Sequence, residues 1–369
     1  MIFEYFCSKR KRSVFMLKKI MIQLLTYPDI DPQQWNELIQ SSPTATWFQT
    51  PEAYEFYASN PEEMEPFAYA IEHNNALCAV CVGYITQEKN RIKQFFTRRA
   101  IIIGGPLLAE DATAEEVAAL LDAVKKLQRS DLQSAGRSTA QRSTGLSPIY
   151  FETRNFHDYS RWKEVFRNSG FAYQPHLNFH VDTTQPWETI ENNIGKHRRK
   201  YIRLSYRDGV EVELKPTLQQ VKEYYAVLQD LYRTKVKMPL QPWSFFERLY
   251  HMPSCKYLLV MYNNQVVGGS ICMILKNHGV YEWYACGKDG MFRNIHPSSV
   301  TKYVGMKYAS DNGYKVFDMM GAGKPDQPYG VRDFKAEFGG ELVEHGRFLC
   351  VRKPLLYWIG KIGVKLLKK

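Results

Sequence analysis

No stretch of the sequence is apolar over the roughly 18–20 residues that a helix needs to cross a membrane. The composition, with 44% hydrophobic and 24% charged residues, is that of a soluble globular protein. A chain of 369 residues is too long for one ordinary hydrophobic core, so we expect two domains.

Cysteine is sparse, and none of its spacings indicates a metal site. Only Cys78 and Cys81 among the seven cysteines have the spacing of a metal-binding pair. They lie in an apolar run typical of a strand, where a spacing of three residues points the side chains to opposite faces. No second pair follows, so the sequence predicts no zinc site and reduced cysteines in a cytosolic protein.

Acidic residues are nearly absent from three basic stretches of a chain whose net charge is +11. Residues 1–19 carry six Lys or Arg and one Glu, while residues 196–207 and 352–369 carry six each and no acid. The rest of the chain is therefore net acidic. Local basic patches of this kind indicate anionic partners such as phosphate, RNA or a membrane surface.

Two segments lack the periodicity of a folded element. Residues 1–20 start like a signal peptide, but Lys18 and Lys19 interrupt the apolar part and no small-residue cleavage site follows. We expect this extension to be disordered, or translated from too early a start. Residues 130–147, rich in Ser, Gly, Gln and Arg, predict a flexible loop.

The two halves of the chain repeat one pattern of elements. Each half has a hairpin with an Asn-Asn turn, a further strand, an amphipathic helix and another strand. The hairpins, helices and last strands fall at 67–85 and 257–275, at 113–127 and 298–312, and at 148–152 and 315–319. Two copies of one α/β unit explain this pattern, although chance likeness of so common an order stays open. We place the units at 21–183 and 184–351, followed by a tail at 352–369.

Residues 315–340 say most about function. An apolar strand ends at Gly321, and the loop after it is too rich in Gly and Pro to continue a strand or helix. Asp318 lies near the strand end, where a carboxylate needs a partner to be buried. A charged and aromatic loop after a strand is typical of a site, and the alternative is a solvated surface loop. The candidate residues of this stretch are Asp318, Tyr329, Arg332, Phe334 and Lys335.

The order strand, hairpin, strand, helix, strand resembles the GNAT acyltransferase fold. Two such units in tandem resemble the Fem family of aminoacyltransferases, which build peptidoglycan interpeptide bridges. The resemblance covers roughly residues 21–351 and rests on three stretches taken in order: 196–212, 281–285 and 329–340. It implies two tandem GNAT-like α/β units, each a mixed twisted sheet flanked by helices, with the active site in the second.

The resemblance also assigns roles to single residues. A Phe-Lys pair at the Fem active site matches Phe334 and Lys335, which implies that Lys335 stabilises the oxyanion formed when an amine attacks an acyl ester. A lysine near its usual pKa is protonated, which suits this role better than that of a base. Asp318 orients Lys335 or satisfies the strand end, and Tyr284 contacts the acceptor or belongs to the core. A solvated helix lysine is the alternative for Lys335.

Arg199 and Arg203, four residues apart on one helix, predict a phosphate-binding face. We expect this face to line the groove between the units, and an exposed basic helix is the alternative. Tyr329 and Arg332 complete the predicted substrate-binding residues.

The sequence lacks the glycine-rich turn with which acyl-CoA-using GNAT enzymes hold a pyrophosphate at a helix start. Residues 293–300 keep the arginine of that motif but not its glycines. This absence favours aminoacyl-tRNA over acyl-CoA as the donor. The long helical hairpin that some Fem proteins use against tRNA is also absent, so both donors stay open. We expect no bound cofactor and no metal.

The tail at 352–369 predicts a basic amphipathic helix, which can lie on an anionic bilayer or pack on the second domain. We therefore expect a cytoplasmic enzyme with a peripheral route to the membrane. The predicted activity is aminoacyl transfer to an amine of a cell-wall or other envelope precursor. The alternatives are acyl-CoA-dependent N-acylation of an amine or amino sugar, and a non-catalytic protein that binds anionic lipid or RNA.

Overall fold

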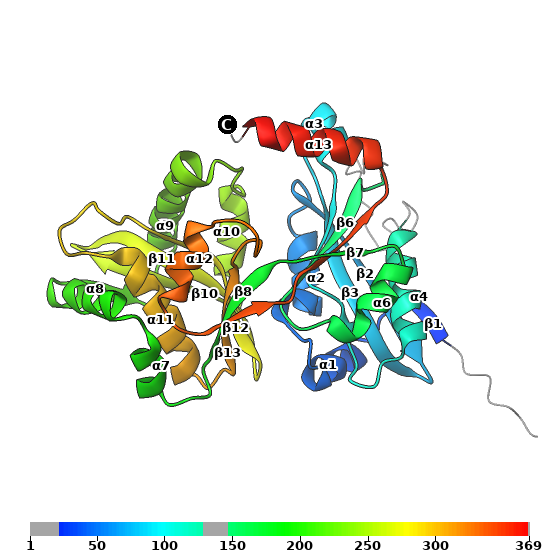
Figure 1. The fold of residues 1–369 in the computed structure, drawn as a ribbon, viewed down its shortest axis with the longest axis horizontal. Helices are drawn as coiled ribbons and strands as arrows, with labels where there is room; N and C mark the ends of the chain where they lie inside the picture. The colour runs from blue at the N-terminus through cyan, green and yellow to red at the C-terminus, as the bar shows by residue number, and fades with distance from the viewer. Residues whose placement is uncertain (1–21, 128–146, 368–369) are drawn as a thin grey trace, which may run out of the picture.

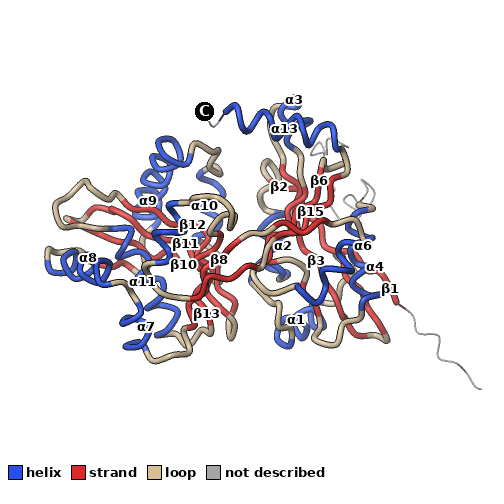
Figure 2. The backbone as a smooth tube through the Cα atoms, in the orientation of Figure 1, coloured by secondary structure: helices blue, strands red, loops and turns tan. Residues whose placement is uncertain are grey.

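The structure is a computed structural model that describes residues 22–127 and 147–367, the side chains of the last four of these excepted. Two mixed β-sheets lie beside each other, each flanked by helices (Figures 1 and 2). Within the described ranges, none of the helices is both long and apolar enough to cross a bilayer. The predicted N-terminal extension and almost all of the predicted loop at 130–147 fall outside the described residues.

The first half of the chain contains β1 (Ile22–Thr26), α1 (Pro32–Ser41), η1 (Trp47–Gln49), α2 (Pro51–Ala58), β2 (Met64–His73), β3 (Ala76–Thr86), α3 (Arg91–Thr97), β4 (Ala100–Gly104), β5 (Leu107–Leu108), α4 (Ala114–Lys125), β6 (Tyr150–Asn155), η2 (Ser160–Trp162), α6 (Lys163–Asn168) and β7 (Ala172–Gln174).

The second half contains β8 (Leu177–Asp182), α7 (Trp187–Asn193), α8 (Lys196–Arg207), β9 (Glu211–Glu213), α9 (Leu218–Leu231), η3 (Tyr232–Val236), α10 (Trp243–Tyr250), β10 (Cys255–Tyr262), β11 (Gln265–Leu275), β12 (Gly279–Gly287), α11 (Pro297–Asp311), β13 (Val316–Gly321), α12 (Gly330–Ala336), β14 (Glu341–Glu344), β15 (Arg347–Val351) and α13 (Pro354–Leu367).

Both sheets have the same strand order, which confirms the predicted repeat. The first sheet runs β1-β2-β3-β4-β6-β15-β7, with the short β5 paired to β3 off this path, and the second runs β9-β10-β11-β12-β13-β8-β14. In each sheet the fourth and fifth strands pair in parallel and all other neighbours are antiparallel. The two units are therefore built on one plan.

The sheets exchange one strand each. Strand β8 belongs to the end of the predicted first unit, 21–183, but lies in the second sheet, and β15 belongs to the end of the predicted second unit, 184–351, but lies in the first sheet. Sheet membership thus departs from the boundaries that we placed at 183 and 351, because the short β7–β8 and β14–β15 connections each pass from one sheet to the other. The functional division into two units stays a prediction.

The turns of the two hairpins explain why the repeat could be recognised in the sequence. Asn74 and Asn75 have φ angles of 52° and 64°, and Asn263 and Asn264 have 50° and 58°. Two left-handed residues in a row form the turn that matches the twist of a two-residue hairpin, and asparagine accepts this conformation more readily than most residues. Each Asn pair therefore fixes the register of its hairpin.

One expectation about this hairpin was wrong. The register of β2 and β3 passes from Ile71 opposite Ala79 to Glu72 opposite Leu77, which leaves Cys78 in a bulge. The bulge removes the strict alternation of faces. Cys78 and Cys81 consequently lie in the same core cluster of the first unit rather than on opposite faces, and both are free and buried.

An aromatic core joins the two units. Phe48 of η1 contacts Trp283 of β12 with ring centroids 5.1 Å apart, and Phe56 of α2 contacts Phe245 of α10 at 5.0 Å. These rings belong to, or pack against, one cluster that continues through both units. Aromatic pairs of this kind stabilise beyond their buried area. Apolar packing thus fixes the relative position of the two sheets. It also fixes the shape of any pocket between them.

Candidate active site

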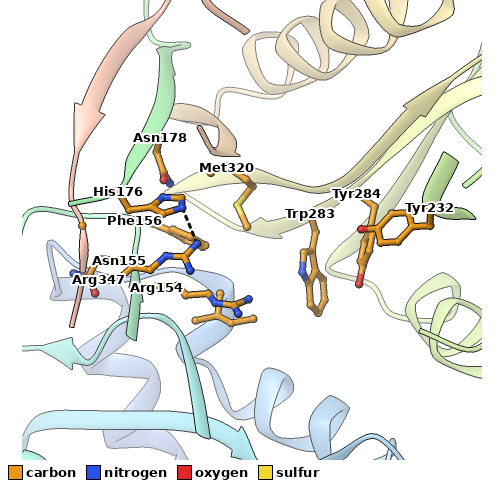
Figure 3. Close-up of a pocket in the computed structure, with 13 residues that line it drawn as sticks. Arg154, Asn155, Phe156, His176, Asn178, Tyr232, Trp283, Tyr284, Met320 and Arg347 are labelled. Carbon is orange, nitrogen blue, oxygen red and sulfur yellow. Dashed lines mark hydrogen bonds between the residues drawn. The ribbon is translucent and has the colours of Figure 1, made fainter. Parts of the chain in front are cut away.

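A pocket of about 280 Å³ lies between the two units. The first sheet contributes residues from the ends of β4, β6 and β15, and the second contributes residues from β8, β12 and β13 (Figure 3). The lining residues are Ile103, Arg154, Asn155, Phe156, His176, Asn178, Tyr232, Trp283, Tyr284, Met320, Gly321, Gly346 and Arg347. The strand exchange places β8 and β15 side chains in one wall.

The polar side of the pocket carries excess positive charge. Glu152 accepts hydrogen bonds from Arg154 Nε at 2.7 Å and from Arg347 Nη1 at 3.0 Å. Burial raises the pKa of Glu152, but the two arginines outweigh it and the net pKa is lowered. Two guanidinium groups therefore share one carboxylate. Arg154 and Arg347 line the pocket and Glu152 does not, so this side of the pocket suits an anionic group.

His176 is a neutral acceptor in this wall. Burial, followed by the charge of Arg347, lowers its pKa to about 4. Its Nδ1 lies 3.2 Å from the carbonyl oxygen of Leu177 and donates to it, so its Nε2 accepts the hydrogen bond from Arg347 Nη2 at 2.9 Å. His176 thus fixes the direction of the Arg347 guanidinium.

The opposite side of the pocket is aromatic. Trp283, Tyr284 and Tyr232 lie together across the cavity from the arginines (Figure 3). Trp283 is the extra residue of a bulge, because Ile271 of β11 pairs with Tyr284 and the next residue pairs with Glu282. Burial raises the pKa of Tyr284, so its hydroxyl stays protonated and can donate a hydrogen bond. An apolar wall facing a few fixed charges is typical of a small-molecule site.

Strands β12 and β13 diverge beside the pocket. Their parallel pairing extends only over Gly279–Tyr281 with Val316–Asp318. The end of β13 then separates from β12 but stays paired with β8 after a bulge, with Gly321 opposite Asn178, and Met320 in the bulge adopts a left-handed φ of 63°. Met320 and Gly321 form part of the pocket wall. The divergence leaves main-chain carbonyl groups that need donors.

Lys335 supplies those donors. Its Nζ lies 2.5 Å from the carbonyl oxygen of Met319, 3.3 Å from that of Met320 and 2.9 Å from that of Gly321. The side chain is 7% exposed, and burial lowers its pKa to about 8 against the opposing charge of Asp318. An ammonium group has three N–H donors, and all three are used here. Lys335 therefore lies behind the wall, and must exchange a bond to reach a ligand.

Asp318 is buried and bound by donors from β8 and from its own strand. It accepts hydrogen bonds from His180 Nε2 at 3.1 Å, Asn178 Nδ2 at 3.5 Å and the amide of Met320 at 2.6 Å. Burial raises the pKa of Asp318, but His180 and the other donors outweigh it and lower the pKa. The carboxylate thus stabilises the left-handed turn that shapes the pocket wall.

The other predicted residues lie around this site without lining the pocket. Tyr329 packs over Gly323, since a Cβ there would lie 2.8 Å from its ring. Arg332 donates to the carbonyl groups of Lys324 and Gln327 and holds the loop. Phe334 packs under the guanidinium of Arg198, 4.6 Å from its ring. Of the predicted residues only Tyr284 is in the pocket wall, and the roles of all of them stay predictions.

The expectation that Arg199 and Arg203 line the groove between the units was wrong. Helix α8, which carries both, lies on the side of the second unit that faces away from the first (Figure 1). It packs on α11, with Tyr201 stacked on His296 at 4.0 Å, because Ile202 and Ser205 face inward. The exposed basic residues of the helix are Lys196, Lys200, Arg203 and Arg207. Arg199 donates to Asn192, and Arg203 is exposed. Their phosphate-binding role stays a prediction.

The residues that the sequence reasoning missed are Arg154, Arg347, His176 and Trp283. Arg154 follows Glu152 by two residues in a strand, and a charged pair of this kind on one strand face is a weak signal. Nothing in the sequence indicates that Arg347 joins them, because β15 reaches this sheet from the far end of the chain.

The N-terminus of α11 is already capped by a carboxylate. Asp289 accepts hydrogen bonds from the amide of Ser298, at 3.3 Å, and from its hydroxyl. A helix N-terminus attracts anions, and a bound carboxylate occupies the positive end that a pyrophosphate needs. This geometry agrees with the missing glycines of residues 293–300.

Comparison with known proteins identifies the class of fold. Residues 191–335 match the family model described as acetyltransferase (GNAT) domain. The crystal structure of FemX is similar at 14% identity and a TM-score of 0.68, with 91% of this chain and 99% of FemX covered. No curated protein sequence matches the chain.

Two further solved structures share the architecture. A tandem GNAT protein from the clavulanic acid biosynthesis pathway has 7% identity and a TM-score of 0.52, over 90% of this chain and 98% of its own. The C-terminal domain of a putative lysylphosphatidylglycerol synthetase from Agrobacterium fabrum has 10% identity and a TM-score of 0.51, over 90% and 96%. The protein therefore has the tandem GNAT acyltransferase fold of FemX, and the predicted fold class is confirmed.

Proposed function

We propose that the protein transfers an acyl group to an amine of a substrate whose anionic group binds Arg154 and Arg347. The observation that carries this proposal is the pocket beside the diverging β12 and β13, with two arginines on one side and Trp283 and Tyr284 on the other. An acceptor amine held against the aromatic wall would be oriented by its anionic part at the arginines.

The chemistry would be attack of the amine nitrogen on an ester or thioester carbonyl carbon. A C–N bond forms, the bond from that carbon to the leaving oxygen or sulfur breaks, and the leaving group takes up the proton that the amine loses. The tetrahedral intermediate carries an oxyanion, which needs a donor nearby. Lys335 would provide it by exchanging one of its three carbonyl bonds, and Asp318 would keep the strand end in place.

The finer proposal is aminoacyl transfer to a cell-wall or other envelope precursor, with aminoacyl-tRNA as the donor. Similarity of fold to FemX and to a domain of a putative lysylphosphatidylglycerol synthetase supports an aminoacyl group. Asp289 at the start of α11 weighs against acyl-CoA. The exposed basic face of α8 beside that helix would bind tRNA phosphates.

A second candidate is CoA-dependent N-acylation of an amine or amino sugar, which the match of residues 191–335 to the acetyltransferase (GNAT) domain favours. Mass spectrometry of envelope precursors from cells that lack the protein separates the two. A missing amino-acid branch supports aminoacyl transfer, and a missing acyl group supports the second candidate. Unchanged precursors and amines would contradict both.

A further inference from the structure

Helices α3 and α13 lie against each other at one end of the first unit, although they are far apart in sequence (Figures 1 and 2). The contact is close, since a Cβ at Gly360 would lie 3.7 Å from the carbonyl oxygen of Phe96. The ring of Tyr357 also packs on Tyr150 of β6 at 5.2 Å. Helix α13 is therefore docked on the first unit.

Two apolar stripes run along α13, and only one of them is used for docking. Leu356, Tyr357 and Gly360 are partly buried on the side of the first unit. Leu355, Trp358, Ile359 and Ile362 follow the helical spacing on the other side, and they are 70%, 61%, 39% and 39% exposed. The second stripe is therefore exposed to solvent.

Helix α3 extends this stripe. Its Ile92, Phe95 and Phe96 are 73%, 41% and 39% exposed, while Gln94 faces inward and holds the helix through the carbonyl of Thr86. In the described part of the chain, seven of the eighteen exposed large apolar side chains lie on these two helices. Such concentration marks an interaction surface, because single exposed apolar residues are ordinarily scattered.

The charges around the seven side chains are positive. Arg91, Arg352 and Lys361 are exposed, and none has an ion pair with a described residue. Glu88, the acidic residue nearest to α3 in sequence, is paired with Lys93. By sequence, residues 352–369 contain six Lys or Arg and no acid. A basic rim around an apolar stripe with a tryptophan complements an anionic bilayer.

We propose that α3 and α13 together form a membrane-binding surface for anionic lipid bilayers. The seven apolar side chains enter the boundary between headgroups and acyl chains, and the basic residues contact the lipid phosphates. A second copy of this chain fits less well, because a self-complementary contact would bring the basic rims together. The proposal goes beyond acyl transfer and does not depend on it.

Strand β15 links this surface to the candidate active site. It leads from Arg347 in the pocket wall to Val351, and α13 begins three residues later. Four residue steps along a strand span roughly 13 Å. Docking on a bilayer would therefore hold the pocket close to the lipid surface.

Flotation of the full-length protein with vesicles tests the surface. We expect the protein to float with vesicles of phosphatidylcholine and phosphatidylglycerol, to float far less with phosphatidylcholine alone, and to be released by salt. We expect both Leu355→Ser/Trp358→Ser/Ile359→Ser and Ile92→Ser/Phe95→Ser to weaken partitioning by at least about tenfold.

The matched control is Leu24→Ser/Met291→Ser, which replaces residues that are 49% and 64% exposed elsewhere and should leave flotation unchanged. Since all the replaced side chains are exposed, melting temperatures should change little. Three outcomes would overturn the proposal. These are no flotation with anionic vesicles, a loss in the α13 variant but not in the α3 variant, and a dimer without vesicle binding that the α13 variant dissociates.

Discussion

The ammonium group of Lys335 donates a hydrogen bond to the main-chain carbonyl of Gly321, 2.9 Å away, and Gly321 lines the pocket between the units. The lysine thus touches the pocket wall from behind. To donate to an oxyanion instead, the ammonium would have to give up the carbonyl of Gly321 as its acceptor. Lys335 therefore has a structural role, because it supports the end of β13. It is also placed for the catalytic role that we propose.

The first prediction separates these two roles. Lys335→Ala should cut single-turnover acyl transfer by about 10²–10³-fold, the loss seen when one oxyanion donor is removed. Some loss of stability should accompany it, because three carbonyl groups lose their donor. Rates are therefore compared at a temperature where circular dichroism shows the variant fully folded. Wild-type turnover in the folded variant would remove Lys335 from the chemistry.

The pKa of Lys335 gives a second prediction. Burial lowers it to about 8, so the ammonium that the mechanism needs is lost as the pH rises through that value. The rate should fall above about pH 8 in the wild type. Lys335→Arg stays charged and should show a lower rate without this alkaline limb, because a planar guanidinium occupies a different position. An identical alkaline limb in both proteins would assign the titration to another group.

Much of the fold was predictable because its signals are local. The Asn-Asn turns fix two hairpins, and the apolar spacing of Val117, Leu120, Leu121 and Val124 predicted α4, where all four side chains are buried. A two-residue turn and a helical period need only neighbouring residues.

The site was less predictable because it depends on distant contacts. Glu152 binds Arg154 from its own strand but also Arg347, which reaches it only through the exchange of β15 between the sheets. From its sequence context, Lys335 looks like an exposed lysine of a short helix. It is buried because β12 and β13 diverge and leave carbonyl groups to be satisfied, a feature that no local pattern records.

The His180–Asp318 pair gives a prediction about stability. Burial lowers the pKa of His180, but the charge and hydrogen bond of Asp318 outweigh it and the net pKa is raised. The folded pKa then exceeds the unfolded value of about 6.5, so the stabilisation is complete below that pH and is lost as the pH rises through the folded pKa. His180→Gln should therefore lower the melting temperature more at about pH 5.5 than at about pH 8.5.

The neighbours of His180 do not reverse this sign. Burial lowers the pKa of His157 to about 4, so it is neutral at the acidic measurement, and burial also lowers the pKa of His345. Asp318 has a lowered pKa and stays ionised there. His345→Gln serves as the matched control, since its ring lies 5.1 Å from that of His180. A loss for His180→Gln that is equal at both pH values would contradict the charged pair.

The basic face of α8 should act on the donor. Arg199→Ala/Arg203→Ala should weaken aminoacyl-tRNA binding and lower the slope of log affinity against log salt by about 1–2, since each lost phosphate contact releases one counterion fewer. Acceptor affinity should not change, because α8 faces away from the first unit. Filter binding over a salt series measures this. A change in acceptor affinity without a change in donor binding would contradict it.

The arginines of the pocket give the sharpest test of the acceptor site. Arg154→Ala should raise KM for an anionic acceptor by roughly 10–100-fold with little change in kcat, because a charged hydrogen bond made equally in the ground and transition states is lost. Arg347→Ala should do the same and also release His176. Arg154→Lys should recover only part, since lysine cannot bind two oxygens in the plane of a guanidinium.

A neutral acceptor and an arginine variant away from the pocket are the two controls for this test. A neutral acceptor that lacks the anionic group should be used equally well by the wild type and by Arg154→Ala, since it has nothing to bind there. Arg161→Ala removes an arginine of the same unit that binds the carbonyl groups of Glu110 and Ala112 away from the pocket, and should leave KM unchanged. If Arg154→Ala impaired both acceptors equally, the arginine would be supporting the wall through Glu152 rather than binding an anion. The acceptor would then have to be sought at the aromatic side of the pocket alone.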